Sequence, residues 1–235
     1  MNYSDLLPVM DELNLYLVSN GLKKSAFIEF DPLDPDFRDS SSNEVWVFKP
    51  ELVAEFNGLL EGLEKSGVIY FQKLTVNTTM DYCVNNKWTE TKRVIESFNI
   101  GSSKEYLNEL INAKSDEQRG FALDYPPDAV FYYNKLINEE VRNSTYVSVC
   151  LAKAKHAGIV IPSWLAYVSF VPEELDIIHN RISRQSRKVG ERYQEFVRKN
   201  NPDLANRVEN HFYDRKLPDS WVKHDGSYLL ITAKR

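Results

Sequence analysis

The sequence of 235 residues predicts an α+β protein, with a small mixed sheet and a helix-rich C-terminal two-thirds. Short apolar and β-branched runs flank one amphipathic segment before residue 76, a pattern typical of a sheet with a packed helix. Beyond residue 100, apolar residues recur at three- and four-residue spacing, which indicates helices. Hydrophobic residues make up 43% and charged residues 27% of the chain, so a buried core is expected without a disulfide or metal.

Residues 1–76 are expected to form a small α/β unit. The segment 44–74 has the order strand, helix, strand, which indicates a crossover connection and a partly parallel sheet. Pro50 opens the helix of this segment, because a proline there loses no hydrogen bond. The predicted elements are a helix over 4–20 capped by Ser4 and stopped by Gly21, strands over 26–30, 44–48 and 68–74, a helix from Pro50 to Gly67, and a loop over 31–43.

Residues 77–235 are expected to be mainly helical and to pack with the first unit as one compact domain. The polar stretch 77–103 is the expected seam between the two parts. Ser102 and Glu105 have the spacing of a capping box, which predicts a helix start. The predicted helices cover 103–113, 115–122, a segment from Pro127, 145–157, 173–199 and 202–213, and strands are predicted over 164–170 and 227–233.

Composition and motifs exclude several classes of function. Cys83 and Cys150 are far apart, so a disulfide scaffold is not expected and a reduced, cytoplasmic location is predicted. No run approaches 18 apolar residues, so no membrane span and no membrane partner are predicted. The glycines form no dinucleotide or phosphate loop, and the four histidines have no metal-ligand spacing. The sequence therefore predicts no metal site and indicates no particular cofactor.

The clearest electrostatic feature is the predicted helix over 181–199, which holds seven basic and two acidic residues in a chain of net charge -5. Several of its cations share one side of the helix, where their heads can converge on a phosphate or carboxylate. The alternative is a solvated face on which Glu191 and Glu195 pair with Arg187 and Arg198. The proposed cationic row consists of Arg181, Arg184, Lys188, Arg192 and Lys199.

Candidate acid and base groups lie near this helix in the sequence. Asp176 precedes His179 by three residues, a spacing that allows a base and the group that orients it. Asp128 follows the rigid corner at Tyr125 and two prolines, in the first turn of a predicted helix. Tyr125 and Trp164 belong to aromatic clusters that would suit a planar ligand, and the same clusters would equally suit a core.

The segment 101–133, GSSKEYLNELINAKSDEQRGFALDYPPDAVFYY, resembles part of a largely archaeal family of uncharacterised proteins, the domain-of-unknown-function family 483. In that family a helix pair leads into a Leu-Gly-Tyr-Pro-x-x-(Ala or Cys)-Val pattern, which matches Leu123 to Val130 here. The runs 161–176 and 190–208 are similar to the second half of the family. The resemblance thus covers about residues 95–213.

Two departures from the family pattern matter. Asp124 stands where the family commonly has glycine. Cysteines that some members carry correspond to Asp128-Ala129 and Glu173-Glu174 here, so the resemblance implies no thiolate metal site. The family has no assigned activity, and the resemblance implies a fold more than a function.

The sequence predicts a protein that binds a small anionic or aromatic ligand, with enzymatic activity left open. Asp128, Asp176 and His179 are the candidate acid and base groups, and the expected ligand contacts are Tyr125, Trp164, Arg181, Arg184, Lys188 and Arg192. One alternative is a nucleotide- or nucleic-acid-associated protein that uses the same basic helix. Another is an oligomeric scaffold subunit with exposed aromatic residues, and a homo-oligomer is compatible with either.

Overall fold

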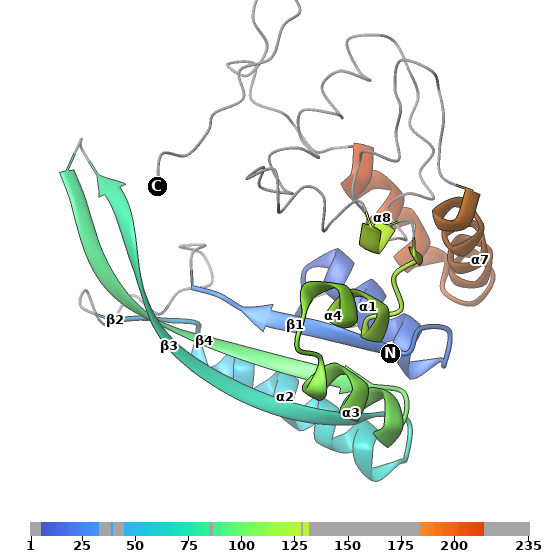
Figure 1. The fold of residues 1–235 in the computed structure, drawn as a ribbon, viewed down its shortest axis with the longest axis horizontal. Coiled ribbons are helices and arrows are strands. Elements are labelled where there is room, and N and C mark those ends of the chain that lie inside the picture. The colour runs from blue at the N-terminus through green and yellow to red at the C-terminus, as the bar shows by residue number, and fades with distance from the viewer. Residues whose placement is uncertain are drawn as a thin grey trace, which may run out of the picture. The chain divides into compact units, whose positions relative to one another are not determined.

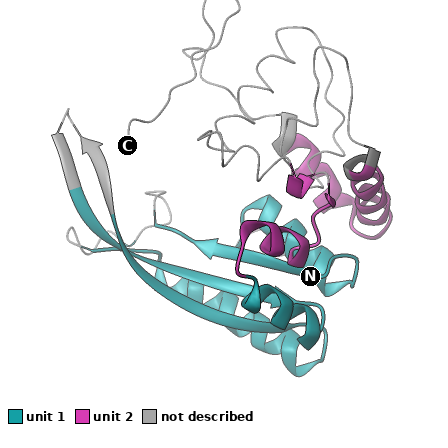
Figure 2. Cartoon of the chain, viewed as in Figure 1, with its two compact units in different colours: residues 1–113 teal, residues 114–235 magenta. Residues whose placement is uncertain are grey.

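The structure is a computed structural model that describes residues 6–32, 39, 45–84, 87–127, 129–131 and 184–213. The chain divides into two compact units, Met1–Ala113 and Lys114–Arg235, shown in two colours in Figure 2. The fold is α+β, as the sequence predicts, with the sheet in the first unit. The predicted division between residues 76 and 77 falls inside strand β3 (Tyr70–Val84), and the units part after Ala113 instead.

A mixed four-stranded sheet organises the first unit (Figure 1). Its strands are β1 (Ser25–Phe30), β2 (Val45–Val47), β3 and β4 (Lys87–Gly101). β3 pairs antiparallel along the whole of β4, so β1 and β2 share the other edge of that strand. The sheet is partly parallel, as expected, and the parallel pair is β2 with β4. The expected crossover between parallel strands over 44–74 is wrong, because β3 is antiparallel to β4, so the two strands that flank α2 run in opposite directions.

The stretch 77–103, expected to be a polar seam, forms most of a long β-hairpin. β3 starts close to the predicted position but continues ten residues beyond residue 74, and β4 returns beside it. Several residues of this ribbon are exposed on both faces, so polar threonines and asparagine are compatible with the strand. The expected polar and apolar alternation is therefore weak here, which hides the hairpin from a hydrophobicity pattern.

One face of the sheet carries the hydrophobic core. Ile28 and Phe98 are register partners, so the side chains of Ala26, Ile28 and Phe30 lie on the same face as those of Phe98 and Ile100. Helices α1 (Val9–Ser19) and α2 (Pro50–Lys65) add Leu15, Val18, Val53, Phe56, Leu60 and Leu63 to this core. Phe56 and Phe98 meet edge to face with ring centroids 5.0 Å apart.

Helix α3 (Lys104–Asn112) follows β4 directly and packs at one end of the sheet. Its cap is Ser103, whose side chain accepts a hydrogen bond from the Tyr106 N–H, rather than the predicted Ser102. The N–H and hydroxyl of Ser102 both donate to the Lys24 carbonyl, before β1, at 2.8 and 3.1 Å. Ser102 is thus hydrogen-bonded to the residue before β1, and the next residue, Ser103, caps the helix.

The second unit begins with α4 (Asp116–Ala122), capped by the Ser115 side chain. The helix ends in a Schellman motif, in which the N–H of Asp124 bonds to the Phe121 carbonyl and that of Tyr125 to the Gly120 carbonyl. Pro127 and residues 129–131 are helical, as predicted for a helix from Pro127. A Cβ on Gly120 would lie 2.9 Å from a Val130 methyl, so the two segments pack closely.

Two further helices, α7 (Arg184–Asn200) and α8 (Pro202–Tyr213), form an α-hairpin. Asn201 joins them, and its side chain accepts a hydrogen bond from the Leu204 N–H while Pro202 occupies the first helical position. Val197, Leu204 and Val208 are buried. The elements predicted over 145–157, 164–170 and 227–233 lie outside the described residues.

Candidate functional site

The sequence-predicted site residues are only partly within the described chain. Asp128, Asp176, His179, Trp164 and Arg181 lie outside the described residues. Arg184 is the first residue of α7. The structure therefore places Tyr125, Lys188 and Arg192, together with Lys199 of the predicted cationic row.

The cations of α7 whose side chains are described fall into two groups. Arg198 faces α8, where its guanidinium binds Glu209 Oε1 through Nη2 at 2.7 Å and through Nε at 2.8 Å. Gln194 also donates to this carboxylate oxygen, at 3.1 Å. The predicted pairing of Arg198 with Glu195 is thus replaced by a bond to the next helix, because a two-pronged contact with Glu209 is available there.

The second group is exposed. Lys188, Arg192 and Lys199 are all exposed, while Tyr193 and Val197 on another side of the same helix are buried. Lys188 and Arg192 are one turn apart, and Lys199 follows two turns later on the same side. In the described part of the chain, neither lysine has an ion pair or hydrogen bond.

A buried tyrosine connects this helix to the predicted corner at Tyr125. Tyr193 is 2% exposed, and the Arg192 guanidinium stands 5.1 Å from its ring centroid. Burial raises the pKa of Tyr193 to about 12; the nearby Asp124 carboxylate raises it further and Arg192 opposes both. The Tyr193 hydroxyl is buried and interacts with both charged side chains, so Asp124, Arg192 and Tyr193 lie close to one another.

Asp124 precedes Tyr125 in the sequence and interacts with Tyr193 of α7, so it connects the basic helix with the predicted corner at Tyr125. Tyr125 itself is half-buried. The basic helix and the Tyr125 corner both belong to the second unit. Asp124 and Tyr193, through which they interact, were not among the predicted site residues. Nothing in the sequence connected Asp124 to Tyr193.

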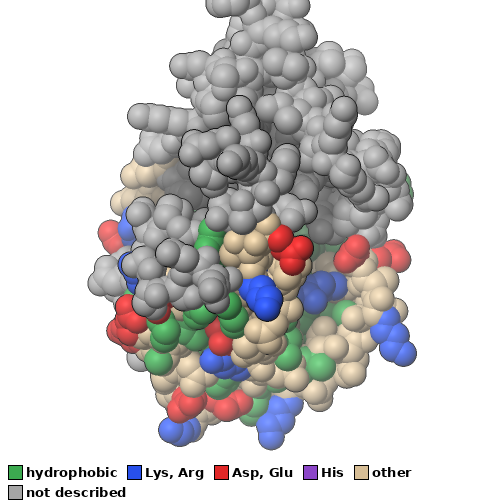
Figure 3. All heavy atoms as spheres, turned by 90° about the vertical axis from the view of Figure 1, so that its left-hand side faces the viewer, with side chains coloured by type: hydrophobic (Ala, Val, Ile, Leu, Met, Phe, Trp, Pro, Cys, Tyr) green, Lys and Arg blue, Asp and Glu red, His purple; other side chains and the backbone are tan. Residues whose placement is uncertain are grey.

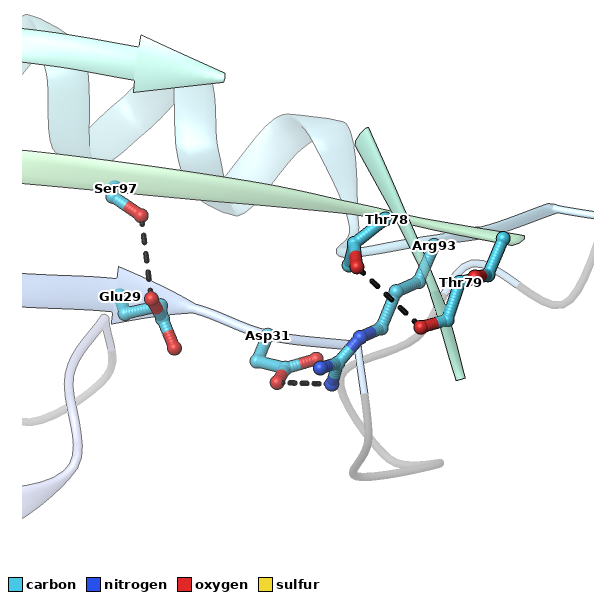
Figure 4. A network of polar contacts seen from close by, with 6 residues as sticks. All are labelled: Glu29, Asp31, Thr78, Thr79, Arg93 and Ser97. Carbon is cyan, nitrogen blue, oxygen red and sulfur yellow. Dashed lines mark hydrogen bonds and ion pairs between the residues drawn. The ribbon is translucent and has the colours of Figure 1, made fainter. Parts of the chain in front are cut away.

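The sheet of the first unit carries a separate polar network on the face opposite its core (Figure 4). Arg93 of β4 donates from Nη1 to Asp31 Oδ2 at 2.6 Å, just beyond the end of β1. Further along the same face, the Ser97 hydroxyl donates to Glu29 Oε2 at 3.5 Å. Three buried atoms near this network have no hydrogen-bond partner among the residues that the structure describes: Arg93 Nε, Asp31 Oδ1 and Asn99 Oδ1.

A titratable group with an unusual pKa lies in the same unit. Burial raises the pKa of Asp11 on α1 from 3.8 to about 6, while Lys23 lowers it and Glu29 raises it. Lys23 is only 4% exposed, and its ammonium donates to Asn14 Oδ1 at 2.6 Å. A carboxyl with this pKa exchanges its proton close to neutral pH, as acid-base chemistry requires.

Sequence reasoning did not find these first-unit residues. One available signal was the alternation in Arg93-Val94-Ile95-Glu96-Ser97-Phe98-Asn99-Ile100, where the core residues Phe98 and Ile100 alternate with Ser97 and Asn99. Asp11 gave no signal, because its neighbours Lys23 and Glu29 are distant in sequence.

Acidic and basic side chains are mixed with hydrophobic ones on the face drawn in Figure 3, with no continuous area of one sign. Within the described ranges, no three His, Cys, Asp or Glu residues are grouped so that they could hold a metal ion. In those same ranges, each helix is too short or too polar to cross a lipid bilayer.

Comparison with known proteins gives no match to the chain, either among protein families, among curated proteins or among solved structures.

Proposed function

We propose that the protein binds an anionic ligand on the exposed side of α7, through Lys188, Arg192 and Lys199. The observation that supports this most directly is the division of the cations on that helix. Arg198 forms an ion pair with Glu209, whereas Lys188 and Lys199 are exposed and lack an acidic partner in the described part of the chain. Exposed lysines that lack a counter-charge among the described residues create a favourable potential for an anion.

The spacing of the row indicates the kind of anion. Lys188 and Arg192 are about 6 Å apart along the helix axis, so both heads can bind one phosphate or carboxylate. Lys199 lies about 10 Å further along, where it would reach a second anionic group. We therefore favour a ligand with at least two anionic groups, such as a polyphosphate or a nucleic-acid strand, over a monoanion. No reaction is proposed.

The resemblance over residues 95–213 includes both α7 and the Tyr125 corner, and we propose that this part of the chain carries the binding function. Arg192 is anchored over the Tyr193 ring, which limits the conformations of its side chain. A restricted arginine loses less entropy on binding than a mobile one.

The test compares two double variants that change the net charge equally. Lys188→Glu with Arg192→Glu reverses the row, and Lys65→Glu with Lys114→Glu reverses two exposed lysines elsewhere. Binding of inorganic tripolyphosphate is measured by calorimetry, and binding of a labelled single-stranded oligonucleotide by fluorescence anisotropy. We expect the first variant to lose at least about tenfold in affinity for one probe and the second to change about twofold or less.

The salt dependence distinguishes the two sources of phosphate. Affinity for an oligonucleotide falls steeply with salt, in proportion to the number of phosphates contacted, whereas a compact polyphosphate gives a shallower slope. Equal loss of affinity in both variants would mean that net charge alone is responsible, and the proposal would fail. The absence of binding to either probe by the unaltered protein would also overturn it.

A further inference from the structure

The outer edge of β3 is open along most of its length. Among the described residues β3 pairs only with β4, and β3 residues 73–77 are all exposed. They include two hydrophobic side chains, Leu74 at 39% and Val76 at 46% exposure. Proteins usually protect a strand edge of this kind, because its unpaired N–H and C=O groups attract another strand.

The hydrogen-bond pattern shows which groups point outward. The Ser102 N–H donates to the Lys24 carbonyl and therefore points toward β1. Successive N–H groups of a strand point to opposite sides, so those of Gly101 and Asn99 face β3. Even-numbered residues of β3 therefore bond to β4, and odd-numbered ones present their N–H and C=O outward. Phe71 agrees, because its N–H donates to the Glu64 carboxylate instead of to β4.

Within the described ranges, only the start of this edge is covered. Glu64, at the end of α2, accepts the outward N–H of Phe71 at 3.4 Å. Beyond it, the outward backbone groups of Lys73, Thr75 and Asn77 have no hydrogen-bond partner in the part of the chain that the structure describes. The open edge thus begins at Lys73 and continues toward the tip of the hairpin, in the extended ribbon of Figure 1.

The sequence of β3 is complementary to itself in one antiparallel register. Its only charged residues are Lys73 and Asp81, which have opposite signs and lie four positions on either side of Asn77. A two-fold axis at Asn77 would place position 73 of one copy opposite position 81 of the other, twice. The same axis pairs Thr75 with Thr79 and, on the other face, Val76 with Thr78. Shifting the register separates the two charged positions.

We propose that two copies of this protein associate edge to edge, by antiparallel pairing of β3 with β3 about Asn77, and form one continuous sheet. The outward groups are odd-numbered, and this register pairs odd-numbered residues with one another, so both chains can exchange backbone hydrogen bonds. Lys73 binds Glu96 of β4 at 3.2 Å within its own chain, so its ammonium must turn from β4 toward the open edge to meet position 81 of the second copy. Leu74 and Val76 would gain hydrophobic contacts.

The test is a charge swap in the full chain, with mass measured by analytical ultracentrifugation. The unaltered protein is expected to be a dimer. Lys73→Glu and Asp81→Lys each place like charges opposite one another, so each variant alone should dimerise at least about tenfold more weakly. An equimolar mixture of the two variants should form heterodimers, because every charged position then meets one of opposite sign.

The mixing result separates the proposal from a folding defect. A variant that had lost its fold would not regain a partner on mixing, and circular dichroism of each variant checks the fold directly. A further variant, Asn77→Pro, removes an outward N–H at the axis, which an edge strand tolerates, and should yield monomers. A monomeric unaltered protein would overturn the proposal, as would variants that dimerise unchanged or a mixture that stays monomeric.

Discussion

Asp124 ends α4 with a backbone conformation that side chains usually avoid. Its φ is 63°, and it occupies the same position in its helix end as Gly21 and Gly67 do after α1 and α2. Glycine is favoured there because a Cβ in the left-handed region costs about 1–2 kcal/mol, although aspartate tolerates it better than most residues.

Comparing Asp124→Gly with Asp124→Ala isolates the free-energy cost of placing a Cβ in the left-handed backbone conformation. Both substitutions remove the carboxylate that acts on Tyr193, so that loss is common to the two variants. We expect the glycine variant to be more stable than the alanine variant by about 1 kcal/mol, measured by urea unfolding. Equal stability of the two variants would contradict a left-handed residue at this position.

Asp11 makes stability depend on pH. Its folded-state pKa of about 6 lies above the ordinary 3.8, so the folded protein holds this proton more tightly than the unfolded chain does. The contribution is complete below pH 4 and is lost as the pH rises through 6, a change of about 3 kcal/mol. Asp11→Asn imitates the protonated form and should remove this dependence.

The measurement is the stability difference between Asp11→Asn and the unaltered protein, by urea unfolding at pH 4 and pH 7. The variant should gain relative stability at pH 7. Glu55→Gln, on the exposed surface of α2, is the control, because it removes a solvent-exposed carboxyl in the same way. A stability difference that is the same at both pH values would show that the Asp11 pKa is not raised.

At the scale of elements, the junction between β4 and α3 depends on close backbone contact. A Cβ on Gly101 would lie 2.5 Å from the Leu107 nitrogen and 2.8 Å from the Ser103 carbonyl oxygen. Both neighbours are backbone atoms, so the contact can be relieved only by moving the helix or the strand. Gly101 is also the last register partner of Ser25 and Tyr70, which resists that movement.

Gly101→Ala should therefore destabilise the protein by about 2 kcal/mol or more, in urea unfolding followed by circular dichroism. Gly62→Ala is the matched control, because Gly62 lies within α2 with nothing within 4 Å of its Cβ position. That control should stabilise the helix by about 0.5–1 kcal/mol. If Gly101→Ala were as stable as the control, α3 would not pack as described.

The elements that the sequence predicted well are those whose ends are marked by nearby residues. α2, α4 and α8 were predicted closely, because proline, serine and glycine at their ends are local signals. The cap of α3 was misplaced by one residue, since Ser102 is engaged by Lys24, which is 78 positions away. Most of the β-hairpin was missed, because exposed strands lack the alternation that a buried face imposes.

The candidate site shows the same limit. Helical spacing was enough to place Lys188 and Arg192 on one side of α7. It did not show that Arg198 is used by Glu209, which depends on the turn at Asn201 that brings α8 back beside α7. Nor could spacing bring Asp124 near Tyr193, a contact that only tertiary structure creates.

For the whole molecule, β4 determines where the chain can be divided. It pairs with each of the other three strands, and it supplies Phe98 and Ile100 to the core. Every member of that core cluster lies before residue 113, so the first unit has its own hydrophobic core. A division at residue 76, by contrast, removes β4 and leaves each remaining strand without its partner.

Two fragments test this division. Residues 1–113 should fold alone and unfold cooperatively in urea, because the fragment keeps the complete sheet and its core. Residues 1–76 should show neither a cooperative transition nor the circular dichroism of a sheet, since isolated strands without partners are not stable in water. Cooperative unfolding of the shorter fragment would show that β4 is dispensable, and a disordered longer fragment would show that the first unit depends on the second.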